Sequence, residues 1–396
     1  MAALPTPGQI DLKSLRRAAR QAITNGVVAA NSSEQRRYWN TWRRFCRTAN
    51  PPLDPMFEHK DPNQTVDALE CYAAWVRSGK AGRGARVGAQ TVQIALRAIG
   101  TQFELDRKPN PIYRPDGNKD YWKSLARMIE GYRRQDPPPK PKLAVPVAVA
   151  TTAAKAAMLT KNPLHQAVND LINIAFYFLL RVGEYTYVST KKRTRTIQFR
   201  IQDITLWKNN KPIPNTATLQ ELLSADAATL TISNQKNGSR GELIHHETIN
   251  LPTCPIKSLA RRIHHIMSCT TDTTTPIAAY QPKPHADLKY VHSSHINTQV
   301  KDLVEQLGYT SCGFDRRSVS SHSLRAGGAM AMKLNNIDRD TIKKFGRWSS
   351  DTFLMYIHEQ ISAFSAGVSK KMTNNIKFHN IAGPTLLQSE PAAASA

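Results

Sequence analysis

The most specific part of this chain is the stretch SHSLRAGGAMAMKLNNIDRDTIKKFGRWSSDTFLMYI, Ser321–Ile357. His322 and Arg325 stand three positions apart at the start of a predicted helix, so their side chains share one face. The first backbone N–H groups of a helix have no partner inside it and suit an anion such as phosphate. Gly327 and Gly328 follow and permit close packing behind that face. Taken alone, this pattern is common and does not indicate a function.

The second half of the stretch places an aromatic residue in a turn and a tyrosine on a helix. Trp348 lies in the turn, and Tyr356 lies beside the apolar stripe of the helix that follows. In isolation, Tyr356 would be interpreted as a tyrosine at the edge of a core. Helices are predicted here over His322–Leu334, Asp338–Phe345 and Ser350–Phe364.

Two segments upstream carry further polar residues. LLRVGEY (179–185) ends a predicted apolar helix, His165–Arg181, with Glu184 one turn on. An arginine at the end of such a helix either reaches solvent or points into a site. ISNQKNG (232–238) puts Lys236 at the tip of a predicted hairpin, where a lysine is usually solvated. Strands are predicted over Ile197–Trp207, Thr229–Asn234 and Leu243–Leu251.

The order of these segments is more specific than any one of them. Arg-x-x-Glu, a hairpin lysine, His-x-x-Arg, Gly-x-Trp and a tyrosine eight residues after the tryptophan follow each other along the chain. This set resembles the tyrosine recombinase (phage integrase-like) superfamily over about Val147–Phe364. Gly-Arg-Trp followed by Ser-Asp and Tyr-Ile looks most like the recombinases of eukaryotic mobile elements, the cryptons and DIRS-like elements.

The resemblance implies covalent chemistry on DNA. Tyr356 would attack the scissile phosphodiester and leave a 3′-phosphotyrosyl bond and a free 5′-hydroxyl. Lys236 would protonate the leaving 5′ oxygen as general acid, with Lys208 and Lys211 as alternatives. The mechanism needs no metal and no nucleotide cofactor, and the sequence contains no phosphate-binding Gly-x-x-x-x-Gly-Lys-Ser/Thr motif.

The remaining site residues take supporting roles in the same resemblance. Arg181 and Arg325 would hold the non-bridging phosphate oxygens, because planar guanidinium groups match phosphate geometry. His322 would assist proton transfer. Trp348 stands where the family often has histidine, one residue closer to the tyrosine than in many phage enzymes. Glu184 would orient its neighbours.

Composition is consistent with a DNA partner but does not prove one. The net charge is +24 among 396 residues, and both halves of the chain are basic. Such a charge indicates a long polyanion, with double-stranded DNA as the expected partner. A type IB topoisomerase, a domesticated DNA-binding protein without catalysis, and a non-enzymatic RNA or chromatin binder are the alternatives.

The predicted fold class is mixed and mainly α: an all-α core-binding domain, then an α+β catalytic domain with a small antiparallel sheet. The consecutive prolines of Asp136–Val147 favour an extended linker between them. The predicted organisation is an N-terminal tail (1–30), a helical DNA-binding domain (31–135), a proline-rich linker (136–147), the catalytic domain (148–369) and a C-terminal tail (370–396). In the first domain we expect helices over about Leu15–Thr24, Ser33–Arg47, Thr65–Arg77, Gln90–Phe103 and Tyr121–Tyr132.

Cysteine and apolar patterns add expectations about the environment. The five cysteines form no C-x-x-C, and the spacing of Cys254, His264, His265 and Cys269 fits no zinc pattern, so no metal site is expected. No apolar run reaches the roughly 18 residues of a membrane span. We expect an intracellular protein, in the nucleus of a eukaryote or otherwise in the cytoplasm with the nucleoid.

The segment beyond about Lys370 is too short and irregular to build its own core. Its apolar residues either fold back on their own domain or pack on a neighbouring protomer. Since recombination must join two duplexes, we expect self-association into a tetramer on DNA.

Overall fold

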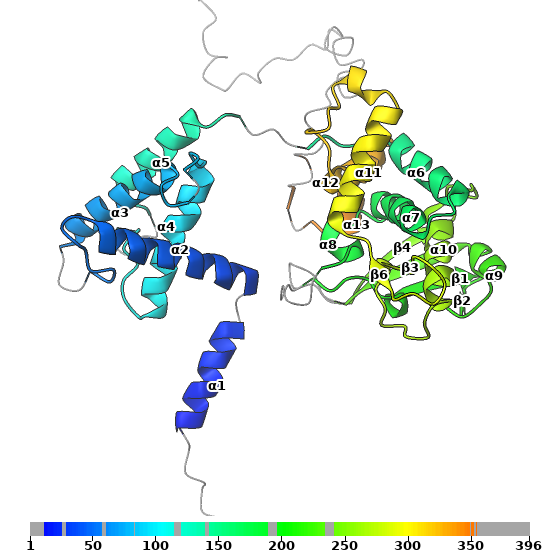
Figure 1. Cartoon of the computed structure of the whole chain (residues 1–396), viewed down its shortest axis with the longest axis horizontal. Helices are drawn as coiled ribbons and strands as arrows, with labels where there is room; N and C mark the ends of the chain where they lie inside the picture. Colours follow the sequence, from blue (N-terminus) through cyan, green and yellow to red (C-terminus); the bar gives the residue numbers. More distant parts are fainter. Residues whose placement is uncertain are drawn as a thin grey trace, which may run out of the picture.

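The structure is a computed structural model that describes residues 12–25, 29–57, 61–82, 84–114, 120–138, 142–188, 196–233, 241–348, 350–351 and 354. The described residues build two large hydrophobic cores, in the two groups of elements that Figure 1 shows, and a third, smaller cluster of Ala144, Ala326, Ala329, Met330 and Ile342. Lys236 and Tyr356, two of the predicted site residues, lie outside the described residues, as does most of the predicted helix Ser350–Phe364.

The first core is made by helices alone. Its centre is Trp42, which is fully buried and packs against Phe45, Phe57 and Tyr72 with ring centroids 5.1–5.7 Å apart. The prediction that Ser33 begins its helix is wrong, because that helix begins four residues earlier. The helices of this half are α1 (Leu12–Asn25), α2 (Ala29–Thr48), α3 (Pro62–Arg77), α4 (Ala89–Leu105) and α5 (Lys123–Gln135).

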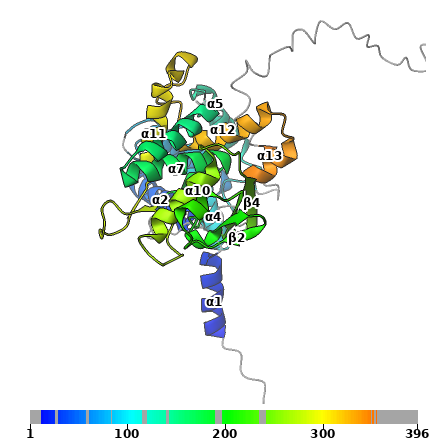
Figure 2. The ribbon, with the colours of Figure 1, turned by 90° about the vertical axis from the view of Figure 1, so that its right-hand side faces the viewer.

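The second core surrounds one apolar helix. α7 (Pro163–Tyr177) is buried along its last eleven residues apart from Tyr177, and Figure 2 shows it among α10, α11 and α12. Most of its buried residues are apolar and need cover, which these neighbours supply, and the buried Asp170 binds Arg261 of α10. The other helices of this half are α6 (Val147–Leu159), α8 (Val182–Tyr185), α9 (Leu219–Leu223), α10 (Pro255–Met267), α11 (Ser293–Gln306), α12 (Ser321–Leu334) and α13 (Arg339–Gly346). Two short 3₁₀ turns cover Ile201–Asp203 and Tyr309–Cys312.

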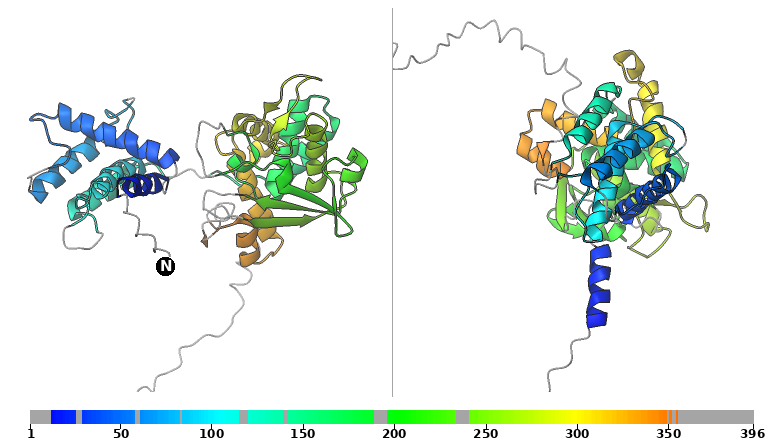
Figure 3. Two further views of the ribbon diagram at one scale, coloured as in Figure 1. Left: turned by 90° about the horizontal axis from the view of Figure 1, so that it is seen from below. Right: turned by 90° about the vertical axis from the view of Figure 1, so that its left-hand side faces the viewer.

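A four-stranded antiparallel sheet flanks these helices, in the order β2-β1-β3-β4. The left view of Figure 3 shows it in green, with the orange helices close to one side. The predicted strand Ile197–Trp207 starts later than expected, because Arg200 and Asp203 close a 3₁₀ turn first. The strands are β1 (Ile204–Lys208), β2 (Lys211–Ile213), β3 (Ala227–Ile232) and β4 (Glu242–Glu247), and a separate pair joins β5 (Ala279–Tyr280) to β6 (Lys289–Tyr290).

One boundary matters for the site. The prediction that the apolar helix runs to Arg181 is wrong, because α7 ends at Tyr177. Leu179 adopts a left-handed conformation with φ 48°, and the Leu180 N–H bonds back to the Ala175 carbonyl at 3.1 Å. This helix-ending turn redirects the chain, so that Arg181 starts a new short helix.

The expected fold class is confirmed: the described residues are mainly helical, with a small antiparallel sheet in the second half. Within the same residues, no helix is both long and apolar enough to cross a membrane.

Candidate functional site

Arg181 and Glu184 are joined by two hydrogen bonds at the start of α8. The Arg181 main-chain N–H donates to Glu184 Oε2 at 2.8 Å, and Arg181 Nη1 donates to Glu184 Oε1 at 3.2 Å. Glu184 is buried, whereas the Arg181 side chain keeps 23% of its exposure. Arg181 is therefore the arginine of this site that reaches solvent while its carboxylate partner stays inside.

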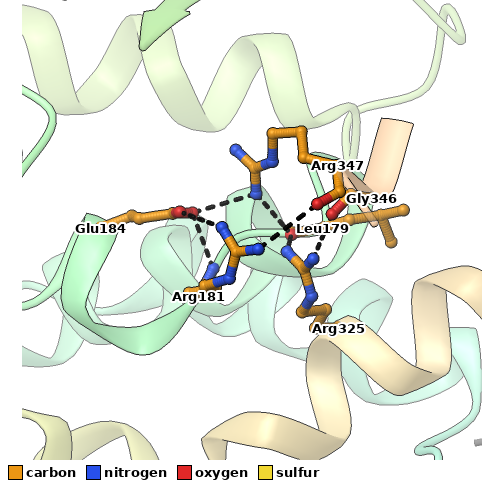
Figure 4. Close-up of polar contacts among 6 residues, drawn as sticks. All are labelled: Leu179, Arg181, Glu184, Arg325, Gly346 and Arg347. Atoms are coloured by element: carbon orange, nitrogen blue, oxygen red, sulfur yellow. Dashed lines mark hydrogen bonds and ion pairs between the residues drawn. The ribbon is translucent and has the colours of Figure 1, made fainter. Parts of the chain in front are cut away.

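Arg347, at the end of α13, binds the same carboxylate (Figure 4). Its Nη2 donates to Glu184 Oε2 at 3.0 Å and to the Leu179 carbonyl at 3.0 Å. Arg181 Nη2 in turn donates to the Arg347 carbonyl at 3.4 Å. Burial lowers the pKa of Arg347, and the Glu184 charge partly offsets that effect. Its Nε and Nη1 are buried without a hydrogen-bond partner.

Arg325 approaches from α12 and completes the cluster. It is 2% exposed, and its two Nη atoms donate to the carbonyls of Leu179 and Gly346. The Trp348 ring covers its guanidinium, with Cζ 4.3 Å from the ring centroid. That ring lies so close to Gly346 that an added Cβ would be 1.6 Å from Cζ3 of Trp348. Glycine is thus required for the tryptophan to reach the arginine.

The two glycines of α12 explain how Arg325 reaches the end of α7. A Cβ on Gly327 would lie 2.2 Å from the Val145 carbonyl oxygen, and one on Gly328 would lie 2.2 Å from the Phe176 carbonyl oxygen. Neither carbonyl oxygen can move away without a shift of the main chain to which it belongs. The Gly-Gly pair therefore lets α12 approach α7 closely enough for Arg325 to bond the Leu179 carbonyl.

His322 lies one helical turn before Arg325, on the exposed side of α12. Partial burial of the imidazole lowers its pKa, and the nearby positive charges of Arg325 and Arg181 lower it further. The neutral imidazole is therefore favoured at neutral pH, and this form can accept a proton.

The structure thus brings together four of the predicted residues, namely Arg181, His322, Arg325 and Trp348. Their chemical roles remain predictions, as do those of Lys236 and Tyr356. Glu184 contacts two arginines, in line with the expectation that it orients its neighbours. The sequence interpretation gave Arg347 no role, although it stands between Gly346 and Trp348 inside the most specific motif.

The cysteine and histidine residues considered for zinc do not form a metal site among the described residues. No group of three or more potential ligands is found there. Cys254 is buried at the start of α10, and the Cys269 Sγ donates to the His265 carbonyl at 3.0 Å.

A second charged surface lies on α2. Arg36, Arg43 and Arg47 are exposed on one face of this helix, and none makes a hydrogen bond or ion pair within the described part of the chain. Arg44 is held in place by the Ala81 carbonyl at 2.8 Å and by the Trp75 ring. Two hollows along this face are lined by Ser33, Arg36, Arg37, Asn40, Thr41, Arg43, Arg44, Arg47, Pro52, Leu53 and Pro55.

Comparisons with known proteins find similarity in structure only. No protein-family model matches the sequence, and no curated protein matches it. A solved Tn1549 transposon integrase in complex with transposon right end DNA aligns at 11% identity and a TM-score of 0.48, over 90% of this chain and 97% of the other. A lambda integrase dimer bound to a core site aligns at 13% identity and 0.44, over 86% and 93%. XerA recombinase aligns at 15% identity and 0.37, over 92% and 99%.

Proposed function

We propose that this chain cleaves and rejoins DNA strands through a 3′-phosphotyrosyl intermediate, in site-specific or transpositional recombination. The observation that carries the proposal is a cluster of three guanidinium groups, from Arg181, Arg325 and Arg347. The Glu184 carboxylate contacts Arg181 and Arg347, and the Leu179 carbonyl accepts from Arg325 and Arg347. This excess of positive charge beside the neutral imidazole of His322 suits the transition state of phosphoryl transfer, in which negative charge builds on the phosphate oxygens.

The chemistry runs in two balanced steps. The Tyr356 oxygen forms a bond to phosphorus, its phenolic proton passes to a base, for which we propose His322, and the bond from phosphorus to the 5′ oxygen breaks. Lys236 delivers a proton to that 5′ oxygen. In the second step a 5′-hydroxyl attacks the phosphotyrosyl bond and regenerates the tyrosine. Arg181 and Arg325 stabilise the charge on the non-bridging oxygens in both steps.

The sheet order favours Lys236 over its two rivals as the general acid. Lys208 and Lys211 join β1 to β2, at the side of the sheet away from β4. Lys236 belongs to the segment between β3 and β4, and Glu242 at the start of β4 is close enough to Arg347 for its charge to raise the pKa of that arginine.

Double-stranded DNA is the proposed partner, and the α2 surface supplies sequence-independent affinity. Its exposed arginines form a strip of positive charge that fits a phosphate backbone. The Gly-Arg-Trp, Ser-Asp and Tyr-Ile motifs support the narrower proposal of an origin in a crypton or DIRS-like mobile element, with action in the nucleus.

The decisive experiment traps the covalent intermediate on a nicked suicide DNA. The parent chain should form a protein–DNA adduct, in the presence of excess EDTA as well as in its absence, whereas Tyr356→Phe should bind DNA and form none. An adduct of equal yield in Tyr356→Phe would overturn the assignment of the nucleophile. Exchange of strands between two sites, rather than relaxation of supercoiled DNA alone, separates a recombinase from a topoisomerase.

Assembly is proposed to depend on the residues after Lys370, which lie outside the described residues. The free chain repels itself at a net charge of +24, and DNA neutralises that charge. Truncation after Lys370 should keep binding to a single site and abolish tetrameric complexes and strand exchange. Tetramers that form as readily from the truncated chain would rule out docking in trans.

A further inference from the structure

His246 lies where three segments of the site meet. It belongs to β4 and pairs with Ala228 of β3. Its ring contacts Phe178 edge to face, with centroids 4.6 Å apart and an interplanar angle of 74°. It also contacts Phe345 of α13, with centroids 5.1 Å apart at 58°. One imidazole therefore touches the end of α7 and the end of α13 from the sheet.

Both aromatic partners lie directly before site residues. Phe178 precedes Leu179, whose carbonyl binds Arg325 and Arg347. Phe345 precedes Gly346, whose carbonyl also binds Arg325. β4 itself follows the segment that contains Lys236. A movement of the His246 ring would consequently be passed to both carbonyls that hold the Arg325 guanidinium.

We propose that His246 is a positioning residue, whose ring keeps the ends of α7 and α13 aligned on the sheet so that the arginine cluster has its reactive geometry. This inference rests on the proposed DNA cleavage. The ring acts by packing and not by charge. Burial lowers the pKa of His246 to about 4, although a hydrogen bond to the main chain of Tyr177 opposes the shift. Its Nε2 is buried with no hydrogen-bond partner, which fits a neutral ring among aromatic neighbours.

The neighbouring His245 provides a matched control. It is the same residue type, one position earlier in the same strand, and its side chain points to the opposite face. It is exposed, and its Nδ1 lies 2.9 Å from Thr229 Oγ1, which also accepts a hydrogen bond from Trp207 Nε1 at 2.8 Å. A substitution there alters the strand but not the ring contacts with Phe178 and Phe345.

The first test compares single-turnover adduct formation by the full chain and three variants on nicked suicide DNA. His246→Ala should slow adduct formation by about 10²-fold at saturating DNA, because small misplacements of catalytic groups are costly. Its affinity for DNA should not change. His246→Phe should recover most of the rate, since it restores a ring, and His245→Ala should react as the parent does. Equal rates in His246→Ala and the parent would overturn the proposal, as would a His246→Phe variant as slow as His246→Ala.

The second test needs no cleavage. In His246→Ala, amide hydrogen exchange should become faster in residues 179–185 and 341–348. In His245→Ala, exchange in both segments should match that of the parent. Uniformly faster exchange across the whole catalytic half would indicate a merely structural role and overturn the proposal. If the parent chain forms no adduct, the proposed function fails, while the exchange result still decides whether His246 aligns the two helix ends.

Discussion

Arg347 Nη2 donates a 3.0 Å hydrogen bond to the carbonyl oxygen of Leu179, and both residues have left-handed backbone, with φ 54° and 48°. Each follows the last residues of a helix, in the position that glycine usually takes. Side chains other than glycine disfavour this conformation by about 1–3 kcal/mol, and such strain persists where surrounding contacts fix it. Two helix ends that are strained in the same way thus meet at the centre of the arginine cluster.

The shared carboxylate predicts an order of stabilities. Glu184→Gln should destabilise the fold more than Arg347→Gln, because the first leaves Arg181 and Arg347 without a carboxylate, whereas the second leaves Glu184 paired with Arg181. Removing one partner from a buried ion pair costs about 3–5 kcal/mol. Urea unfolding of both variants measures the order, and an equal or reversed order would contradict the central role given to Glu184.

The Trp348 contact predicts the effect of a single methyl group. Gly346→Ala should displace the Trp348 ring, since the new Cβ would lie 1.6 Å from it, and so uncover Arg325. Adduct formation should slow while DNA affinity stays unchanged. Gly131→Ala in α5 is the matched control, because its Cβ would meet nothing within 4 Å. That control should be neutral or more stable by up to about 1 kcal/mol. A parental cleavage rate in Gly346→Ala would show that Trp348 does not support Arg325.

Some features of the site follow from local spacing, and others depend on distant contacts. The shared face of His322 and Arg325 follows from a separation of three residues in a helix. The close approach of α12 to α7 follows from Gly327 and Gly328. The left-handed turn at Leu179 does not follow from the sequence, because no glycine marks it, and the pattern therefore predicted a helix that was four residues too long.

Arg347 illustrates the same limit for function. Its position between a glycine and a tryptophan was visible, but an arginine in a turn is usually solvated. Its burial depends on a carboxylate 163 residues away and on the Leu179 carbonyl, 168 residues away. The contact of His246 with Phe178 and Phe345 depends in the same way on how the sheet packs on two helix ends. Sequence periodicity reports which face is apolar, not which distant partner that face meets.

The role proposed for Arg325 predicts that a substitution there slows DNA cleavage without weakening DNA binding. Arg325→Lys should slow adduct formation by about 10²–10³-fold, because an ammonium group cannot donate to two carbonyls and a phosphate in the geometry of a guanidinium. Affinity for DNA should change little, since many other basic residues contribute. Single-turnover cleavage and a binding titration on the same DNA measure both quantities. Cleavage at the parental rate would remove Arg325 from the mechanism.

The arginines of the α2 surface predict how the affinity for DNA depends on salt concentration. Replacing Arg36, Arg43 and Arg47 by glutamine should lower the slope of log affinity against log salt by roughly 3, because each phosphate that an arginine neutralises adds about 0.9 to that slope. Arg316→Gln is the control, because that arginine already binds Asp302 and Glu305. An unchanged slope in the triple variant would show that this face does not bind DNA.

Acid conditions test two partly buried histidines in the second half of the chain. Burial lowers the pKa values of His246 and His265 from 6.5 to about 4. Between these values the unfolded chain binds protons that the folded chain excludes, so stability is constant above about pH 6.5 and falls as the pH is lowered towards 4. His246 should contribute a loss of about 2–3 kcal/mol between pH 7 and pH 4.5, at 1.36 kcal/mol per pKa unit, and the more exposed His265 should contribute less, because solvent screens it.

The variant His246→Phe measures how much of the stability lost on acidification is due to His246. The change removes the titrating group but keeps a ring, so the difference in unfolding free energy between pH 7 and pH 4.5 should shrink by about 2–3 kcal/mol. His265 still contributes in this variant, as do His295 and His322, whose pKa values burial also lowers. Hydrogen bonds lower the pKa values of Glu221, Asp272 and Asp338, so their contributions are lost mainly at lower pH. Burial raises the pKa of Asp170, but this group is present in the parent and in the variant, so its effect cancels in the comparison. His245→Ala, on the exposed face of the same strand, should leave the difference nearly unchanged. If His246→Phe lost as much stability on acidification as the parent, His246 would not be the buried neutral ring on which the alignment of the two helix ends depends.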